Sequence, residues 1–168
     1  MSSSSSPQAP RAAILFVEIT TGFLAGQKIP FGDPRLECRN EIAPHVVAEV
    51  DRATMLSVLQ NVLQNAAEAY GPEVERKEIR ASAVLEKSGD EVRIEIADAG
   101  AGMSEETKGK LFELFYTTKP RGTGVGMPTI KRLVELVHGG RVEIESEQGQ
   151  GTTVKITLPT HAAGRGRQ

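Results

Sequence analysis

The sequence predicts an α+β fold: a two-layer sandwich in which a mixed, mostly antiparallel sheet is covered on one face by helices. Residues 77–97 and 141–159 each contain two segments with alternating apolar and polar side chains, joined by a short polar or Gly-rich turn, which is typical of a β-hairpin. Segments with helical spacing lie between these hairpins, so helices and strands occur in groups. This grouping favours the layered sandwich and argues against a doubly wound parallel sheet. The 168 residues suffice for one domain with a proper core.

The N-terminal part of the chain predicts one helix and two strands. Apolar spacing over residues 12–26 indicates a short helix that Gly26 would end. A Gly- and Pro-rich loop follows. Residues 35–43 and 45–51 then predict two strands joined by a turn at Pro44.

Neither end of the chain has the composition of a folded core. Residues 1–10 are rich in Ser and Pro, and residues 160–168 are small or polar. We therefore predict a disordered linker or expression remnant at 1–10, one folded domain at 11–159 and a flexible tail at 160–168.

The overall composition argues against two broad classes of function. A formal net charge of -2 offers no basic surface for nucleic acid or for an anionic membrane, so we expect neither partner. No apolar stretch approaches the roughly 20 residues that span a bilayer. Cys38 is the single cysteine, which excludes an intrachain disulfide and fits a reducing compartment. We expect a cytoplasmic domain, although a longer parent protein could be anchored in a membrane.

The clearest helix is predicted over residues 55–70, where apolar residues recur on one face and Gly71-Pro72 follows as a stop signal. Asn61, Asn65 and Glu68 form a polar stripe beside that apolar face. Such a stripe can be a solvated surface. However, Asn is a mediocre helix former, and carboxamides that border a core need partners, which a metal-phosphate group would supply.

Two glycine-containing segments follow later in the chain. Asp98-Ala-Gly-Ala-Gly-Met103 comes at the end of a predicted strand, where the Asp can accept a hydrogen bond from an exocyclic amine such as adenine N6. By itself this segment could be only a turn. A short helix predicted from Ser104 to Leu114 comes next, capped by the Ser hydroxyl.

The second segment, residues 117–127, leads into a predicted helix with Ile130, Leu133, Val134 and Val137 on one face. Alternating glycines before a helix N-terminus leave backbone amides free for an anion, and Lys119 and Arg121 add positive charge. The spacing matches neither the Rossmann fingerprint nor the P-loop.

The ordered set of motifs resembles the ATP-binding module of the GHKL superfamily, which includes histidine kinases, DNA gyrase, mismatch-repair ATPases and a heat-shock chaperone. The likeness covers about residues 51–159, and the motifs look most like those of a sensor histidine kinase. They are the N box NVLQNAAEA, the first glycine box DAGAGM, the F box LFELFYTTK, the second glycine box GTGVGM and the third glycine box GQGTTVKITLP. The resemblance implies the Bergerat-type ATP-binding fold, with ATP and Mg²⁺ as cofactors.

The resemblance also implies roles for individual residues. Asn65, and with it Asn61, would hold Mg²⁺, and Asp98 would take the adenine amine. Asn65, Lys119 and Arg121 would carry the catalytic contribution, with Phe112 and Phe115 anchoring a mobile lid. The nucleotide-binding set comprises Asn61, Asn65, Asp98, Gly100, Gly102, Met103, Lys119, Gly122, Thr123, Gly124, Val125, Gly126, Met127 and Thr152.

Two positions depart from the common kinase pattern. Ala69 stands where many of these kinases have an aromatic residue four positions after the magnesium Asn, and Tyr70 follows it. This pattern resembles the nitrogen-regulation subgroup of sensor kinases. Leu114 stands where the family often has Pro.

A complete histidine kinase also carries a dimerisation hairpin with a phosphoacceptor His followed by an acid. His45, His138 and His161 lack an acidic neighbour on that side, so we interpret all three as structural or exposed. The implied partners are therefore the phosphoacceptor hairpin of the parent kinase and, downstream, a response regulator.

Three alternative functions can be compared with the sequence. A stand-alone protein-serine kinase of the anti-sigma-factor type shares the fold and also lacks the hairpin. A degenerate docking module would not need its pocket residues intact. A gyrase-type ATPase places a Glu four residues before the magnesium Asn as a base for water, whereas Asn61 in that place is a poor base.

Overall fold

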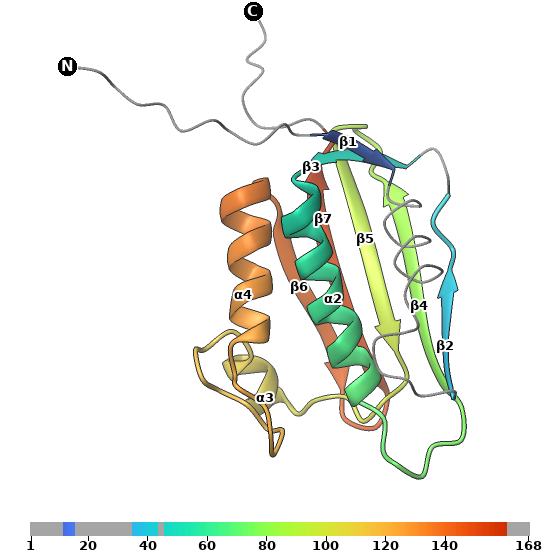
Figure 1. Ribbon diagram of the computed structural model, residues 1–168, viewed down its shortest axis with the longest axis vertical. Helices are drawn as coiled ribbons and strands as arrows, with labels where there is room; N and C mark the ends of the chain where they lie inside the picture. The colour runs from blue at the N-terminus through green and yellow to red at the C-terminus, as the bar shows by residue number, and fades with distance from the viewer. Residues whose placement is uncertain (1–11, 16–34, 44–45, 161–168) are drawn as a thin grey trace, which may run out of the picture.

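The computed structural model describes residues 35–43 and 46–160, together with the backbone of residues 12–15. Five strands form the main sheet in the order β2-β4-β5-β7-β6, and β1 pairs with β3 in a separate two-stranded sheet (Figure 1). The elements are β1 Ala12–Leu15, β2 Leu36–Asn40, β3 Val47–Val50, α2 Arg52–Glu68, β4 Lys77–Leu85, β5 Glu91–Asp98, α3 Glu105–Lys110, α4 Gly126–Arg132, the π-helical η1 Leu133–Val137, β6 Arg141–Glu147 and β7 Gly151–Pro159.

The main sheet confirms the predicted α+β sandwich. β2 runs parallel to β4, while the β4-β5, β5-β7 and β7-β6 pairings are antiparallel. Helices α2 and α4 lie side by side over one face of this sheet (Figure 1). The sheet is therefore mixed, mostly antiparallel and covered on one side.

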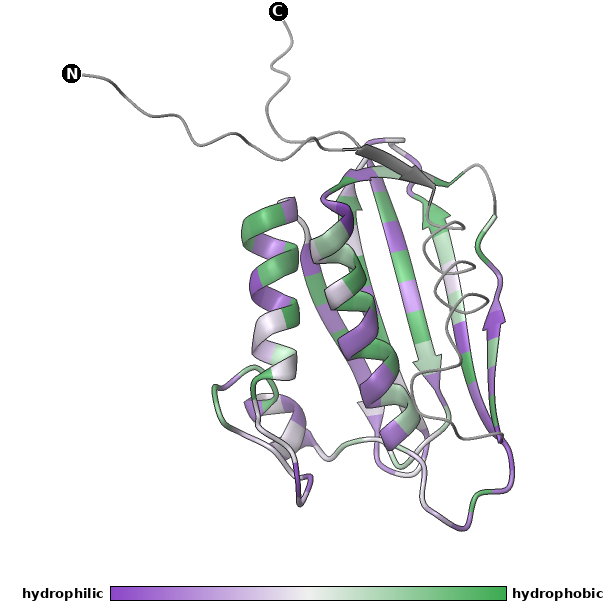
Figure 2. Ribbon diagram, viewed as in Figure 1, coloured by the Kyte–Doolittle hydropathy of each residue, from purple (hydrophilic) through white to green (hydrophobic). Residues whose placement is uncertain are grey.

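Alternation along the strands explains why one face is buried. In β5, Val92, Ile94 and Ile96 are buried and are interleaved with polar or small residues, which gives the banded colouring of that strand in Figure 2. Buried residues of β7 at Val154, Ile156 and Leu158 lie opposite them in the ladder. Ion pairs such as Arg93–Glu95 and Lys155–Glu145 cover the other face of the sheet.

Helix α2 supplies most of the opposing layer. It begins at Arg52 because Asp51 caps it: the Asp51 carboxylate accepts a hydrogen bond from the Thr54 amide at 2.8 Å. The helix ends at Glu68, two residues before the predicted end at Tyr70. Its buried face consists of Met55, Val58, Leu59, Val62, Leu63, Ala66 and Ala67.

Two local predictions are corrected by the structure. Residues Ala12–Leu15 form strand β1 instead of the start of a helix, and residues 16–26 of that predicted helix lie outside the described residues. The two strands predicted on either side of Pro44 do form, and they join different sheets, because β2 pairs with β4 and β3 pairs with β1. The helix predicted from Ser104 to Leu114 ends at Lys110. The first correction reflects a short apolar run, which cannot distinguish a helix from a buried strand.

The described region ends at Thr160, the first residue of the predicted tail. Thr160 is held by hydrogen bonds from its amide to the Asp90 carbonyl and from its hydroxyl to the Gly89 carbonyl. Residues 1–11 and 161–168 lie outside the described residues, as do His45 and His161. His138 is buried at the C-terminal cap of η1. Among the described helices, none has the length and apolar character needed to cross a membrane.

Candidate nucleotide site

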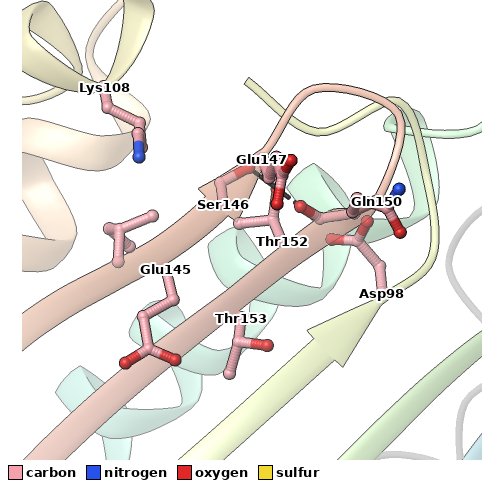
Figure 3. Close-up of a pocket in the computed structure, with 10 residues that line it drawn as sticks. Asp98, Lys108, Glu145, Ser146, Glu147, Gln150, Thr152 and Thr153 are labelled. Atoms are coloured by element: carbon pink, nitrogen blue, oxygen red, sulfur yellow. Dashed lines mark hydrogen bonds between the residues drawn. The ribbon is translucent and has the colours of Figure 1, made fainter. Parts of the chain in front are cut away.

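The buried face of the sheet changes from apolar to polar at one end. Ile96 of β5, Val154 of β7 and Ile144 of β6 lie opposite one another in the ladder, and the next residues on the same face are Asp98, Thr152 and Ser146. We call these three residues the polar rung. They line a pocket of about 430 Å³ together with residues of the β6–β7 turn (Figure 3). A pocket of this size suits a small ligand.

Asp98 is the only carboxylate of the polar rung. Burial raises the pKa of Asp98 above its ordinary value, and hydrogen bonds from the Gly100 and Thr152 backbone offset this only in part. The Gly100 amide donates to Asp98 Oδ1 at 2.8 Å. Asp98 is thus a part-buried acceptor held by backbone amides.

The other two members of the rung are linked through their hydroxyls. Ser146 Oγ lies 2.9 Å from Thr152 Oγ1, and it also accepts from the Met103 amide at 2.9 Å. The predicted residues Asp98, Met103 and Thr152 are therefore brought together. Ser146 lies with them. The sequence did not indicate this, because a Ser in an alternating strand carries no distinctive signal.

The loop from Asp98 to Met103 packs closely on its neighbours. A Cβ on Gly100 would lie 2.6 Å from Ala69 Cβ, and the Ala101 amide donates to the Ala69 carbonyl at 2.8 Å. Gly102 has φ +63, and a Cβ there would lie 2.0 Å from the Glu147 carbonyl oxygen. Both glycines are required by close contacts with α2 and with the β6–β7 turn. This packing explains the small residue Ala69 at the end of the N box.

Lys108 of α3 lines the same pocket and was also missed by the sequence analysis. Figure 3 shows its side chain extending from α3 on the side of the pocket away from Asp98. Its Nζ pairs with Glu105 at 2.5 Å. A Lys in a short polar helix gives no signal of this position.

A second group of predicted residues meets at the C-terminal end of α2. Asn65 Oδ1 accepts a hydrogen bond from Lys119 Nζ at 2.9 Å, and Asn65 Nδ2 lies 3.2 Å from Met127 Sδ. Lys119 Nζ also pairs with Glu68 Oε2 at 2.5 Å. The polar stripe of α2 therefore faces the loop between α3 and α4.

The charges in this group influence one another. Partial burial acts to raise the pKa of Glu68, but hydrogen bonds from Lys119 and Gln64 outweigh it, so the pKa lies below its ordinary value. Glu68 is consequently ionised around neutral pH, and it holds the Lys119 ammonium beside Asn65.

Asn61 lies one turn before Asn65 on the same helix. Its Nδ2 donates to the Ser57 carbonyl at 2.9 Å, while Oδ1 is 3.7 Å from the place of a Cβ on Gly126. This leaves the Asn61 oxygen directed at the N-terminus of α4. Gly126 thus lets the polar stripe approach the α4 backbone.

The loop between α3 and α4 is closed at its base by backbone contacts. The Phe115 amide donates to the Gly124 carbonyl at 2.9 Å, and Phe115 has φ +65. A Cβ on Gly124, itself at φ +68, would lie 2.3 Å from the Phe115 carbonyl carbon. Gly124 is therefore needed where the two ends of the loop meet.

The two phenylalanines expected to anchor this loop differ. Phe112 packs against the core, and Lys131 lies 4.9 Å above its ring centroid. Phe115, by contrast, has a side chain that is 76% exposed, so it contributes through its backbone only. The sequence could not distinguish the two aromatic residues.

The remaining predicted loop residues stay at the surface. Arg121, Gly122, Thr123 and Val125 are exposed, and in the described part of the chain Arg121 makes no hydrogen bond or ion pair with Asn65 or Asp98. The structure thus joins Lys119 and Met127 to Asn65, while it leaves Arg121 apart.

The donor set suits a cation that is shared with a phosphate chain. Among the residues that the structure describes, no three His, Cys, Asp or Glu side chains gather as a metal site. Asn61 and Asn65 offer carboxamide oxygens, which are ligands that Mg²⁺ accepts, and Mg²⁺ commonly takes its remaining ligands from water and substrate phosphates. The residues therefore fit Mg²⁺ bound together with a nucleotide.

Comparison with known proteins accounts for this arrangement. A family profile described as "Histidine kinase-, DNA gyrase B-, and HSP90-like ATPase" matches residues 50–162. The chain belongs to this family. Within it, the chain is a histidine-kinase-type catalytic ATPase domain with the five-stranded fold of such domains.

Curated relatives are similar over most of this chain. Nitrogen regulation protein NtrY of Azorhizobium caulinodans is 34% identical over 132 residues, which cover 76% of this chain and 17% of NtrY. Sensor histidine kinase ZraS of Escherichia coli K12 is 33% identical over 122 residues, covering 73% of this chain and 24% of ZraS. The chain thus spans a quarter or less of either relative.

Solved structures share the fold. The catalytic domain of histidine kinase ThkA matches with a TM-score of 0.77 and 25% identity, over 90% of this chain and 97% of that domain. ThkA in complex with response regulator protein TrrA matches with a TM-score of 0.73 and 23% identity, over 89% of this chain and 42% of that one. The second match supports the fold alone.

Proposed function

We propose that this histidine-kinase-type domain binds Mg-ATP and positions its γ-phosphoryl group for transfer to a His on a dimerisation hairpin outside these 168 residues. The observation that carries the proposal is the double contact of the end of α2. Asn65 meets the lid cation Lys119, and Ala69, four residues later, meets the loop that follows Asp98. The last turn of α2 thus connects a proposed phosphate site at Asn65 with a proposed base site at Asp98, and these two sites match the two ends of ATP.

At the base end, Asp98 is proposed to accept a hydrogen bond from the adenine amine. A carboxylate matches the exocyclic N–H of adenine and opposes the carbonyl oxygen that guanine carries in that place. Thr152 lies beside Asp98 in the polar rung and completes the polar wall. Gly100 and Gly102 are proposed to let the base lie close to the loop, which packs directly on Ala69 and on the Glu147 carbonyl.

At the phosphate end, the proposed ligands of Mg²⁺ are Asn65 and Asn61. When bound, Mg²⁺ would neutralise phosphate charge. Lys119 would leave Asn65 Oδ1 and turn its ammonium to the phosphates, and Arg121 would join it from the exposed part of the loop. The backbone amides of Gly124, Val125 and Gly126, together with Gly122, Thr123 and Met127, are proposed to complete the phosphate side.

The contribution to catalysis is placement and charge neutralisation, as phosphoryl transfer generally requires. Asn61 cannot remove a proton from water, so rapid hydrolysis is not expected. The proposed partners are the phosphoacceptor hairpin of the parent kinase and a response regulator, and the proposed location is the cytoplasm.

Incubation with γ-labelled ATP and magnesium tests this proposal. The purified chain alone should bind ATP without labelling itself. When the dimerisation hairpin of the parent kinase is added, that hairpin should acquire an acid-labile, base-stable phosphoramidate. Labelling of Ser or Thr on a partner would instead favour the anti-sigma-factor type of kinase, and rapid release of phosphate would favour a hydrolytic ATPase.

A further inference from the structure

Tyr70 connects three separate segments through its phenol group. It lies two residues after the last residue of α2, and its hydroxyl reaches both β4 and the loop after β5. The hydroxyl donates to the Glu78 carbonyl, and it accepts from the Glu78 amide at 3.3 Å and from the Ala99 amide at 2.8 Å. A phenol oxygen can donate one hydrogen bond and accept two, so the hydrogen-bonding capacity of the Tyr70 hydroxyl is fully used.

The contact with Ala99 acts on the peptide group that joins Asp98 to Ala99. The Ala99 N–H and the Asp98 carbonyl belong to one rigid plane. Tyr70 holds the N–H side of this plane. On the other side, the Asp98 carbonyl oxygen lies 2.1 Å from the place of a Cβ on Gly151, so any side chain there would displace it. The plane is therefore fixed between Tyr70 and the β7 backbone.

The position of this plane determines where the backbone amide that holds the Asp98 carboxylate lies. Strand β5 ends at Asp98, so the Ala99 amide lies beyond the strand ladder and has the phenol as its partner. The Gly100 amide, one residue further, donates to Asp98 Oδ1 at 2.8 Å. A rotation about the Cα–C bond of Asp98 would move the Ala99 and Gly100 amides away from their acceptors, and the carboxylate would lose the donor that holds it.

We propose that Tyr70 is a positioning residue for base recognition, which sets the direction of the Asp98 carboxylate through the Ala99 peptide. This inference rests on the proposed function, because it takes Asp98 as the acceptor of the adenine amine. It adds a residue outside the glycine boxes and the N-box asparagines to the determinants of base specificity.

Tyr70→Phe is the decisive variant, because it keeps the ring and removes only the hydroxyl. ATP affinity, measured by calorimetry with magnesium, should fall about three- to tenfold, the range that one lost hydrogen bond produces. The affinity for inosine triphosphate, which has a carbonyl where ATP has the amine, should change less than about twofold by the same reasoning. Ser88→Ala is the matched control, since it removes a hydroxyl that accepts from the Asp90 amide in the β4–β5 turn.

A double-mutant cycle with Asp98→Asn separates positioning from general support. If Tyr70 acts through Asp98, then Tyr70→Phe should add little to the loss already caused by Asp98→Asn. Equal losses for ATP and inosine triphosphate, or full additivity with Asp98→Asn, would overturn the inference. Unchanged ATP binding by Tyr70→Phe would overturn it as well.

Amide hydrogen exchange without nucleotide keeps this test separate from the test of the proposed function. The Ala99 amide should exchange faster in Tyr70→Phe than in the wild type, whatever the chain binds. If the wild type binds no ATP, the proposed function fails. If it binds ATP and the Ala99 amide is equally protected in both proteins, the positioning role fails.

Discussion

Lys119 Nζ lies 2.9 Å from Asn65 Oδ1, although 54 residues separate the two in the chain. The ammonium therefore occupies the oxygen proposed to bind Mg²⁺. Two cations cannot share one carboxamide oxygen favourably, so binding of the metal requires Lys119 to move. Glu68, which also binds Lys119, resists this movement.

Glu68→Gln should therefore release Lys119 and strengthen ATP binding. The two side chains of this ion pair are 39% and 41% exposed, so solvent screening limits its strength. We expect ATP affinity to rise about two- to fivefold, measured by calorimetry with magnesium. Glu91→Gln is the control, because it breaks a similarly exposed pair with Arg141 away from the site. A weaker affinity would mean that Glu68 instead orients Lys119 toward phosphate.

Asn65→Ala should abolish the magnesium dependence of ATP binding without unfolding the domain. The substitution removes the proposed ligand oxygen and leaves no buried charge behind, so the core of α2 is unaffected. ATP affinity measured with magnesium should fall to the value measured with a chelator. Gln60→Ala, an exposed carboxamide on the same helix, should leave the magnesium effect intact. A magnesium effect that survives in Asn65→Ala would refute the assignment.

Asp98→Asn should weaken ATP and reduce discrimination against GTP. The Asn amide N–H can donate to the guanine carbonyl, which the carboxylate repels. An unmatched buried polar pair costs about 1–3 kcal/mol, so the ratio of the two affinities should shift by about five- to 150-fold. Competition between ATP and GTP measures this ratio. Equal losses for both nucleotides would show that Asp98 is only a turn residue.

The same substitution should change how stability depends on pH. Because the pKa of Asp98 is raised in the folded protein, the native state binds this proton more tightly than the unfolded chain does. Wild-type stability is therefore lost as pH rises from the unfolded value, about 3.9, through the raised folded value. The Tm of Asp98→Asn relative to the wild type, without nucleotide, should be higher at pH 7 than at pH 3.5. A difference that is constant across this range would contradict the burial of Asp98.

Gly124→Ala should open the base of the loop between α3 and α4. A Cβ at this position would clash with Phe115, in addition to the strain of φ +68. Hydrogen exchange over residues 116–123 should be fast without nucleotide and slowed by ATP in the wild type, but fast in both states in the variant. Gly139→Ala provides a close control, because Gly139 has φ +66 with nothing within 4 Å of its Cβ position. Slow exchange in both states of the wild type would argue against a mobile lid.

Local patterns were sufficient for most elements of the fold. The apolar spacing of α2 and the alternation of β4, β5, β6 and β7 arise from neighbours in sequence, and these elements form as predicted. Local patterns could not predict which distant segments pair as strands. Ala12–Leu15 becomes a strand because β3, more than 30 residues later, pairs with it, and β2 finds its parallel partner in β4.

The site shows the same division. The motifs identified Asn65, Asp98 and Lys119. Asn65 is a carboxamide in an apolar helix, Asp98 is a carboxylate at the end of a strand, and Lys119 is a cation in a Gly-rich loop. Tyr70 was missed, since its phenol acts on a peptide 29 residues away. Phe115 was expected to be an anchor because aromatic side chains are usually buried. Its exposure could not be predicted from the motif.

Because of the polar rung, the two ends of strands β5, β6 and β7 should differ in how well they tolerate insertions and deletions. Asp98, Thr152 and Ser146 share a face with the core only because their spacing from Ile96, Val154 and Ile144 is an even number of residues. One residue added or removed between Thr152 and Val154 would turn Thr152 toward the charged outer face. A change of length in the turn after Glu86, at the other end of β5, would leave that spacing intact. Length variation should therefore be confined to one end of this sheet.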